Sequence, residues 1–164
     1  MKVFIKNKML SLGEGSDVLN ENQQPVFRVK GKVFSFTRKK EMYDMEGKLL
    51  YIIQNRFWNF FAHKAYIKNA EGQRLATIKK SKFSFNFNYK LEDCENEMSI
   101  EGKFFSRESR IMKNGQHAAT ILREFSLVND AFSLEAEEQD IPFFTALVIG
   151  LDNIKDERDN DNRR

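Results

Sequence analysis

The stretch Asp140–Ile154, with the sequence DIPFFTALVIGLDNI, decides the fold of this chain. Between Ile141 and Leu151 only Thr145 and Gly150 interrupt a run of apolar residues. We interpret the stretch as one short helix that is apolar on every side. A helix of that kind is not stable on a protein surface, so the rest of the chain must enclose it.

Both ends of the stretch support a helix. Asp140 is a good N-cap, and Pro142 falls in the first turn, where a missing N–H costs nothing. The alternative is a membrane span, but a helix of about 14 residues is roughly 21 Å long and a hydrocarbon core is about 30 Å thick. The following residues 155–164, KDERDNDNRR, have little to bury, and we expect a disordered charged tail.

Burial of this helix is expected to dominate the stability of the fold. Its large apolar side chains each contribute about 1.5–3 kcal/mol when buried, or on the order of 12–24 kcal/mol together. The net stability of a domain is only about 5–15 kcal/mol. The eight side chains are Ile141, Phe143, Phe144, Leu147, Val148, Ile149, Leu151 and Ile154.

The chain before the helix is predicted to be β-structure. Residues 82–91, KFSFNFNYKL, alternate strictly between apolar and polar side chains, which indicates a strand with one buried and one wet face. Further strands are expected at residues 3–5, 25–30, 33–36, 48–54, 73–79, 97–100, 103–106, 109–113, 116–123 and 131–136. A sheet of ten to twelve short strands must curl or close to hide its edges. The sequence therefore predicts an all-β fold, a closed antiparallel barrel that encloses the C-terminal helix.

Three turns mark hairpins in this sheet. Residues 44–47 and 69–72 each begin with Asp or Asn and have Gly three positions later, which favours a type I turn whose Gly takes positive φ. Asn114-Gly115 favours a tighter type I′ turn. Recurrent turns of this kind, each followed by an apolar run, indicate an antiparallel meander.

Composition is typical of one globular domain in a reducing compartment. The 164 residues are 41% hydrophobic, and the single cysteine, Cys94, excludes an internal disulfide and a cysteine-cluster metal site. The start, MKVFIKNK, is not typical of a secretory signal. We therefore expect a cytoplasmic protein.

Charge is divided unevenly along the chain. Residues 1–90 hold 18 Lys and Arg against 7 Asp and Glu, a net charge of +11, whereas residues 91–164 have a net charge of −8. One interpretation is that a closed sheet scatters these charges in space. The other is a basic face for acidic partners.

Residues that could carry enzyme chemistry are few. Cys94 with His63 or His117 could form a thiol–imidazole pair, but the acidic neighbours of Cys94 would raise the thiol pKa rather than lower it. The two histidines have no spacing signature of a metal site. The pair Glu137-Glu138 precedes the helix, where carboxylates are favourable electrostatically without any catalytic role. We expect no catalytic residue, no metal and no cofactor.

Two basic clusters are the candidate binding residues: Arg38, Lys39, Lys40, Lys79, Lys80 and Lys82. They are either solvated turns and sheet edges, where lysine discourages edge-to-edge pairing, or a patch for anionic lipid headgroups. Phe57, Trp58, Phe60 and Phe61 lie near Arg56 and Lys64 in the sequence, a pattern that can stack on nucleic-acid bases but is also typical of a core.

The chain resembles a known family in three motifs. These are YD-x-x-GKLLYI at residues 43–52, IKN-x-x-G at residues 67–72, and the apolar helix that ends in Leu151-Asp152. They are similar to the LURP-one-related family, whose fold is similar to the tubby C-terminal domain and the phospholipid scramblases. The resemblance covers residues 1–154 and implies a twelve-stranded barrel around the C-terminal helix. Related tubby domains bind phosphoinositide headgroups, whereas the acidic calcium-binding segment expected of a scramblase is missing from this sequence.

Residues and resemblance together predict a non-enzymatic binding or scaffold domain at residues 1–154. The favoured ligand is the acidic lipid headgroup at the inner membrane surface, which would make the protein cytoplasmic and peripheral on that membrane, not transmembrane. The alternatives are a protein-interaction scaffold without a lipid ligand, a nucleic-acid binder and an enzyme.

Overall fold

The structure, a computed structural model, describes residues 1–6, 15–31, 37–56, 64–80, 87–102, 107–125 and 130–161. Within these ranges the chain forms twelve strands, a short 3-10 helix and one α-helix. In chain order they are β1 (Lys2–Lys6), β2 (Ser16–Asn20), β3 (Pro25–Gly31), β4 (Lys40–Tyr43), β5 (Leu49–Asn55), β6 (Lys64–Lys68), β7 (Arg74–Lys80), β8 (Phe87–Glu92), β9 (Met98–Gly102), β10 (Glu108–Lys113), β11 (Gln116–Phe125), β12 (Asp130–Ala136), η1 (Glu138–Asp140) and α1 (Ile141–Asp161).

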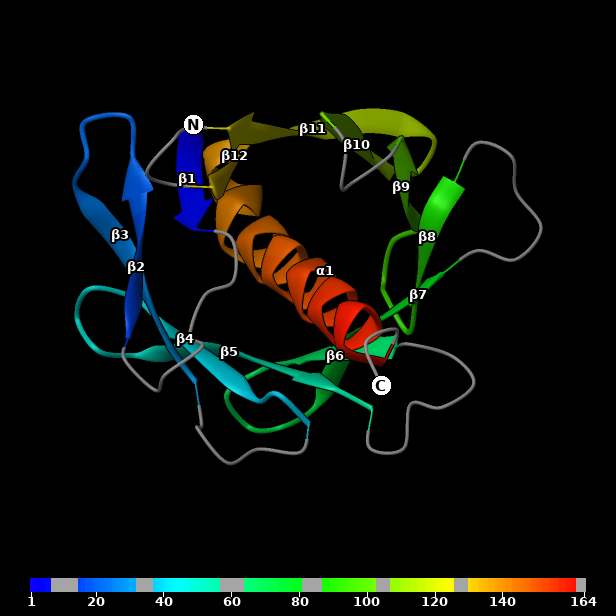
Figure 1. The fold of residues 1–164 in the computed structure, drawn as a ribbon, viewed down its shortest axis with the longest axis horizontal. Helices are drawn as coiled ribbons and strands as arrows, with labels where there is room; N and C mark the ends of the chain where they lie inside the picture. The colour runs from blue at the N-terminus through cyan, green and yellow to red at the C-terminus, as the bar shows by residue number, and fades with distance from the viewer. Residues whose placement is uncertain are drawn as a thin grey trace.

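The strands close into one antiparallel barrel, as the sequence predicts. Strands β2 to β12 follow one another around the barrel in chain order, and β1 closes the ring between β12 and β2. Figure 1 shows this ring of strands with α1 running through its middle. Because the order is a simple meander, segments that are neighbours in the sequence are also neighbours in the wall.

The helix α1 fills the barrel. Every residue from Phe144 to Ile154 is buried, including Thr145 and Asn153. This burial confirms the interpretation of the apolar run as an enclosed helix. The helix lies close against the wall at Gly150, where an added Cβ would meet the Cδ1 atom of Ile78 on β7 at 2.6 Å.

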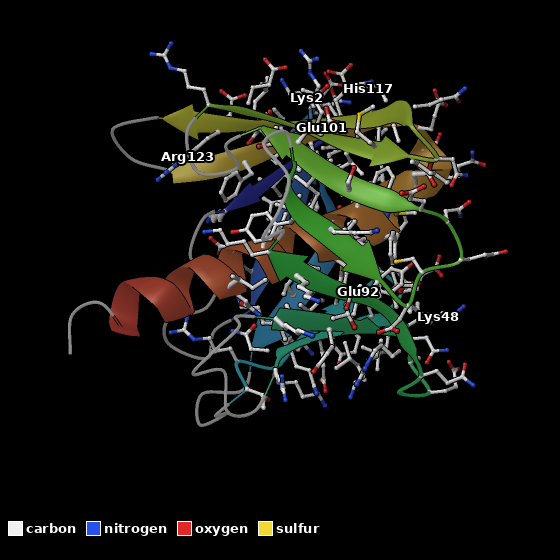
Figure 2. All side chains as sticks on the ribbon, turned by 90° about the vertical axis from the view of Figure 1, so that its right-hand side faces the viewer. Lys2, Lys48, Glu92, Glu101, His117 and Arg123 are labelled. Atoms are coloured by element: carbon white, nitrogen blue, oxygen red, sulfur yellow. The ribbon has the colours of Figure 1, made fainter. Side chains whose placement is uncertain are left out.

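The two ends of α1 differ from the prediction in one respect. The helix begins at Ile141, directly after Asp140, as expected, but the predicted end at Ile154 was wrong because α1 continues through Asp161. Residues 155–161 contain neither Gly nor Pro and include good helix formers, so the helix continues beyond its buried part. In Figure 2 this end of α1 projects beyond the strands. Residues 162–164 of the predicted tail lie outside the described residues.

Polar contacts hold α1 where it leaves the barrel. The Asn153 Nδ2 atom donates to the Arg38 carbonyl at 3.2 Å, and the Asn55 Nδ2 atom donates to the Asn153 carbonyl at 3.3 Å. Asn55 is 1% exposed and its backbone N–H donates to the Thr37 carbonyl at 2.6 Å. These bonds fix the exit of the helix to the start of β4 and the end of β5.

The predicted turns are confirmed. Gly47 and Gly72 have φ values of 87° and 83°, and their N–H groups donate to Asp44 and Asn69 three residues earlier. Asn114-Gly115 has positive φ at both residues, 51° and 77°, as a type I′ turn requires. These turns set the register of the hairpins on either side of them.

The structure also contains strands that the sequence did not predict, namely β2, β4 and β6. In the strand predicted at residues 82–91, Tyr89 and Leu91 are buried and Lys90 is exposed, which confirms the alternation there. The first part of that strand, and the strands predicted at residues 33–36 and 103–106, lie outside the described residues.

Candidate functional site

The basic side chains that the sequence singled out come from strand ends on one rim of the barrel. The register pairs Lys40 on β4 with Ile53 on β5, and Lys64 on β6 with Lys79 on β7. The start of β4, the end of β5, the start of β6 and the end of β7 therefore lie side by side. This is the rim at which α1 leaves the barrel, and we call it the exit rim. The fold thus brings Arg38 and Lys39 to the same rim as Lys79 and Lys80.

Lys40 has to be removed from the predicted surface patch. It is only 6% exposed. Lys40 and Met42 lie on the same face of β4, because side chains two apart in a strand share a face, and that face points into the barrel. Its ammonium is consequently withdrawn from the surface. Lys82, the last of the six predicted residues, lies outside the described residues.

Arg38 and Lys39 are engaged in the structure of the rim itself. The Lys39 Nζ atom lies 2.7 Å from Glu41 Oε1, and these two side chains are 26% and 21% exposed. The Arg38 carbonyl accepts the hydrogen bond from Asn153 described above, and Arg38 has a positive φ of 48°. The Arg38 backbone therefore helps to hold α1 to the start of β4, and the Lys39 side chain pairs with Glu41 on the same strand end.

A larger basic surface lies on the outer wall next to this rim. Ala65 and Ile78 are buried and point inward, so alternate residues of β6 and the end of β7 point outward, and a register shift beside Lys68 puts Arg74 on the same outer face. Five outward cations lie on three adjacent strands, and we call this surface the basic wall. Its members are Lys64 and Lys68 on β6, Arg74 and Lys79 on β7, and Lys90 on β8.

Three lysines of the basic wall are in direct register. Lys64 is the cross-strand partner of Lys79, and Lys79 is the partner of Lys90. Lys68 is likewise the direct partner of Arg74. Adjacent strands are about 4.8 Å apart, so the three lysines form a row roughly 10 Å long across the wall. Like charges directly opposite each other destabilise a sheet, which makes this row costly for folding.

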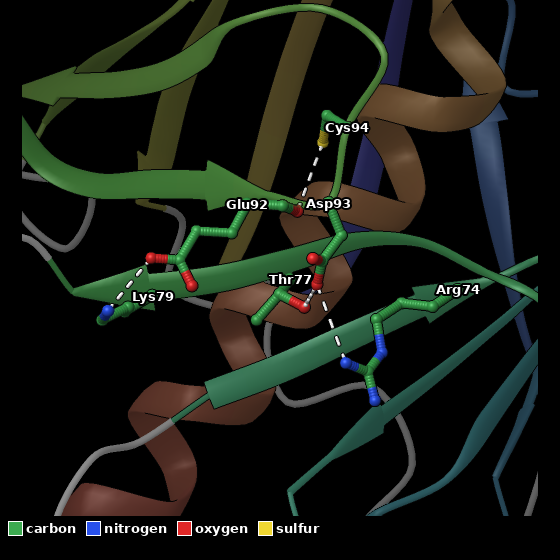
Figure 3. Close-up of polar contacts among 6 residues, drawn as sticks. All are labelled: Arg74, Thr77, Lys79, Glu92, Asp93 and Cys94. Atoms are coloured by element: carbon green, nitrogen blue, oxygen red, sulfur yellow. Dashed lines mark hydrogen bonds and ion pairs between the residues drawn. The ribbon is translucent and has the colours of Figure 1, made fainter.

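The wall also holds two carboxylates among its described residues (Figure 3). Glu92 Oε1 lies 3.0 Å from Lys79 Nζ, and Asp93 Oδ2 lies 3.7 Å from the Arg74 guanidinium. Thr77 Oγ1 donates to the same Asp93 oxygen at 2.6 Å. The guanidinium also lies 4.1 Å from the centre of the Tyr66 ring, a cation–π contact that orients it. These contacts leave the wall with five cations and two anions.

Cys94 lies at the edge of the wall and is unsuited to nucleophilic chemistry. The side chain is half-buried, and its Sγ atom lies 3.7 Å from the Glu92 carbonyl. Burial and the nearby Asp93 carboxylate raise the pKa of the Cys94 thiol to about 11. The sequence predicted this direction, because a thiol beside carboxylates remains protonated at neutral pH.

The histidines do not join Cys94 in a described contact. His117 Nε2 lies 3.0 Å from Thr120 Oγ1 on the same strand, and His63 lies outside the described residues. Within the described ranges, no group of three or more His, Cys, Asp and Glu side chains could hold a metal ion. The aromatic residues Phe57, Trp58, Phe60 and Phe61 also lie outside the described residues.

Two open hollows lie over β9 to β12. Their volumes are about 590 and 370 Å³, and both are lined by His117 and Thr120. A bulge in β11 at Ala118 places these two residues on one face, although their spacing would otherwise put them on opposite faces. Both hollows mix carboxylates with lysine or arginine, so neither presents a uniform charge to a ligand.

The sequence missed four of the five residues of the basic wall: Lys64, Lys68, Arg74 and Lys90. The turn at residues 69–72 contained the information needed, because it sets the pairing of β6 with β7 and so places Lys64 opposite Lys79. This pairing can be predicted only if residues 64–68 are identified as a strand. Clusters of adjacent basic residues were easier to see but less relevant, because neighbours in a strand point to opposite faces.

Comparison with known proteins identifies the family of this chain. A match to the family described as LURP-one-related covers residues 1–152, and the chain belongs to that family. It is also 23% identical over 155 residues to a protein of Bacillus subtilis (strain 168) called uncharacterized protein YxjI, a match that covers 94% of this chain and 93% of the relative. No solved structure gives a significant match. In the described part of the chain, no helix has both the length and the apolar character needed to cross a bilayer.

Proposed function

We propose that this chain is a non-enzymatic binding domain that associates with acidic lipid headgroups at the inner membrane surface. The observation that carries the proposal is the gathering of five cations on the outer face of β6, β7 and β8. A basic face of this size attracts anionic surfaces, and each Lys or Arg near a membrane contributes about 1 kcal/mol of attraction. Such binding is reversible and makes the protein peripheral on the membrane from the cytoplasmic side.

A binding role also fits the interior of the barrel. The helix α1 occupies the space in which other barrels hold a small ligand, so recognition takes place on the outside. The raised pKa of Cys94 and the contact of His117 with Thr120 support a non-enzymatic role for these two residues. Membership of the LURP-one-related family agrees with a binding or scaffold domain.

The test is co-sedimentation of the purified protein with vesicles. We expect pelleting with vesicles of phosphatidylcholine that contain phosphatidylserine or a phosphoinositide, and none with phosphatidylcholine alone. Binding should weaken as salt is raised from 0.1 M to 1 M, because the Debye length falls from about 10 Å to about 3 Å. Failure to pellet with any anionic vesicle at low salt would refute the proposal. Binding to single-stranded nucleic acid but not to vesicles would favour the nucleic-acid alternative.

A further inference from the structure

We infer that the barrel meets an anionic membrane with its side, through the row Lys64, Lys79 and Lys90, and not with the exit rim. This inference rests on the proposed function and assigns the contact surface within it. The distinction matters because two basic surfaces lie next to each other. The rim carries Arg38, Lys39 and Lys80, whereas the row lies directly beside that rim on the outer face of the wall, beginning with Lys64 at the start of β6.

The projecting end of α1 argues against contact through the rim. The helix is buried as far as Ile154 and continues to Asp161, seven residues further. At about 1.5 Å per residue, this part of the helix extends roughly 10 Å. It stands out from the exit rim in Figure 2. A flat bilayer approaching end-on would therefore meet the helix end before it met the strand ends.

The charges that follow Ile154 do not favour an end-on approach. Residues 155–164, KDERDNDNRR, contain four carboxylates and four cations, so this segment carries no net charge that would attract an anionic bilayer. A side-on approach keeps the helix end away from the lipid surface.

The register of the wall supplies the positive reason for a side-on approach. Lys64, Lys79 and Lys90 are direct partners on three consecutive strands, so their side chains leave the sheet in the same direction. A planar array of cations matches a planar array of headgroups without any rearrangement. The Glu92 carboxylate, 3.0 Å from Lys79, offsets part of the repulsion within the row, and an anionic surface would offset more of it.

Three variants of equal charge change separate the wall from the rim. The wall variant carries Lys64→Gln, Lys79→Gln and Lys90→Gln, and the rim variant carries Arg38→Gln, Lys39→Gln and Lys80→Gln. The control carries Lys2→Gln, Lys48→Gln and Arg110→Gln, which lie on β1, on the turn before β5 and on β10. Each loses three positive charges, so a difference between them reports position. Thermal melts establish that each variant is folded before its binding is compared.

The readout is partition onto vesicles of phosphatidylserine and phosphatidylcholine at low salt. We expect the wall variant to bind at least about tenfold more weakly than wild type, and the rim and control variants to stay within about threefold. If wild type binds the vesicles and the wall variant binds them equally strongly, the inference is overturned and the proposed function remains intact. A larger loss in the rim variant than in the wall variant would also overturn it. Wild type that does not bind at all would instead refute the proposed function.

A second measurement reports orientation directly and does not depend on these variants. In a Cys94→Ser background, a fluorophore is attached through Gln54→Cys or through Gln116→Cys. Gln54 is the cross-strand partner of Tyr66 on the basic wall, and Gln116 lies on β11, outside the basic wall. Vesicles with a nitroxide headgroup should quench the label at residue 54 and leave the label at residue 116 bright. Equal quenching, or the reverse order, would contradict a side-on contact through the wall.

Discussion

The contact between Gly150 and Ile78 provides a quantitative test of how α1 sits in the barrel. An added Cβ at Gly150 would lie 2.6 Å from Ile78 Cδ1, and at 3.6 and 3.7 Å from Ile53 Cγ2 and Ala65 Cβ. Only the first distance is shorter than a real contact. Gly150→Ala therefore gains about 1 kcal/mol of helix propensity but loses about 1–3 kcal/mol to overpacking. The net expectation is a loss of stability between about zero and 2 kcal/mol.

The partner substitution should reverse this loss. Ile78→Val removes the Cδ1 atom, and alone it should cost about 0.5–1.5 kcal/mol because it leaves a cavity. In the double variant the new Cβ occupies the space that Cδ1 vacated, so the overpacking and the cavity disappear together. We expect a coupling energy of about 1–3 kcal/mol, with the double variant close to wild type or slightly more stable.

The assay is chemical denaturation of wild type, both single variants and the double variant, with thermal melts alongside. For a chain of this size about 1 kcal/mol corresponds to roughly 2–4 °C in Tm. Single-variant effects that add to within about 0.5 kcal/mol would refute the reasoning, because additivity is typical of sites that do not touch. If the contact with Ile78 did not exist, Gly150→Ala would stabilise the helix through its higher helix propensity.

Two further predictions concern the helix and the cysteine. A chain ending at Gln139 should not fold, whereas one ending at Ile154 should keep its Tm within a few degrees, because α1 is buried up to Ile154; a soluble 1–139 fragment that melts cooperatively would disprove the central role of α1. The pKa of the Cys94 thiol is raised from an ordinary 9.0 to about 11, so the folded thiol is mostly protonated at pH 9, and iodoacetamide should react with it about fiftyfold more slowly than in denaturant. The reaction should become faster as the pH rises towards 11, and equal rates for folded and denatured protein at pH 9 would contradict the half-buried position of Cys94. Cys94→Ser should leave vesicle binding unchanged.

The fold could be predicted where local chemistry and the burial pattern agree. Turns that begin with Asp or Asn and end with Gly predicted the hairpins, and the apolar run predicted the enclosed helix. The turn after β2 was missed, although it has the same form, because Gln23 takes a positive φ of 62° in the position where Gly stands elsewhere. Asn20 supports that turn with hydrogen bonds from the backbone N–H groups of Asn22 and Gln24.

The site was harder to predict because it depends on pairing between strands. Lys40 lies in a basic run, yet its position in β4 turns it into the barrel. Lys64 and Lys90 are isolated in the sequence, yet the register brings both beside Lys79. The sequence shows which residues are charged, whereas the register between strands decides which charged side chains share a face.

The topology of the barrel keeps the basic half of the chain together in space. A barrel of Greek-key order would interleave distant segments and mix their charges. This barrel runs from β2 to β12 in chain order, so the basic first half of the chain keeps its own sector of the wall, whereas residues 98–136, which include β9 to β12, hold five Lys and Arg against five Asp and Glu. With α1 filling the interior, that outer wall is the surface on which the chain can recognise a ligand. If the proposed function holds, the meander and the central helix together direct binding to the basic wall, where the lysine row lies.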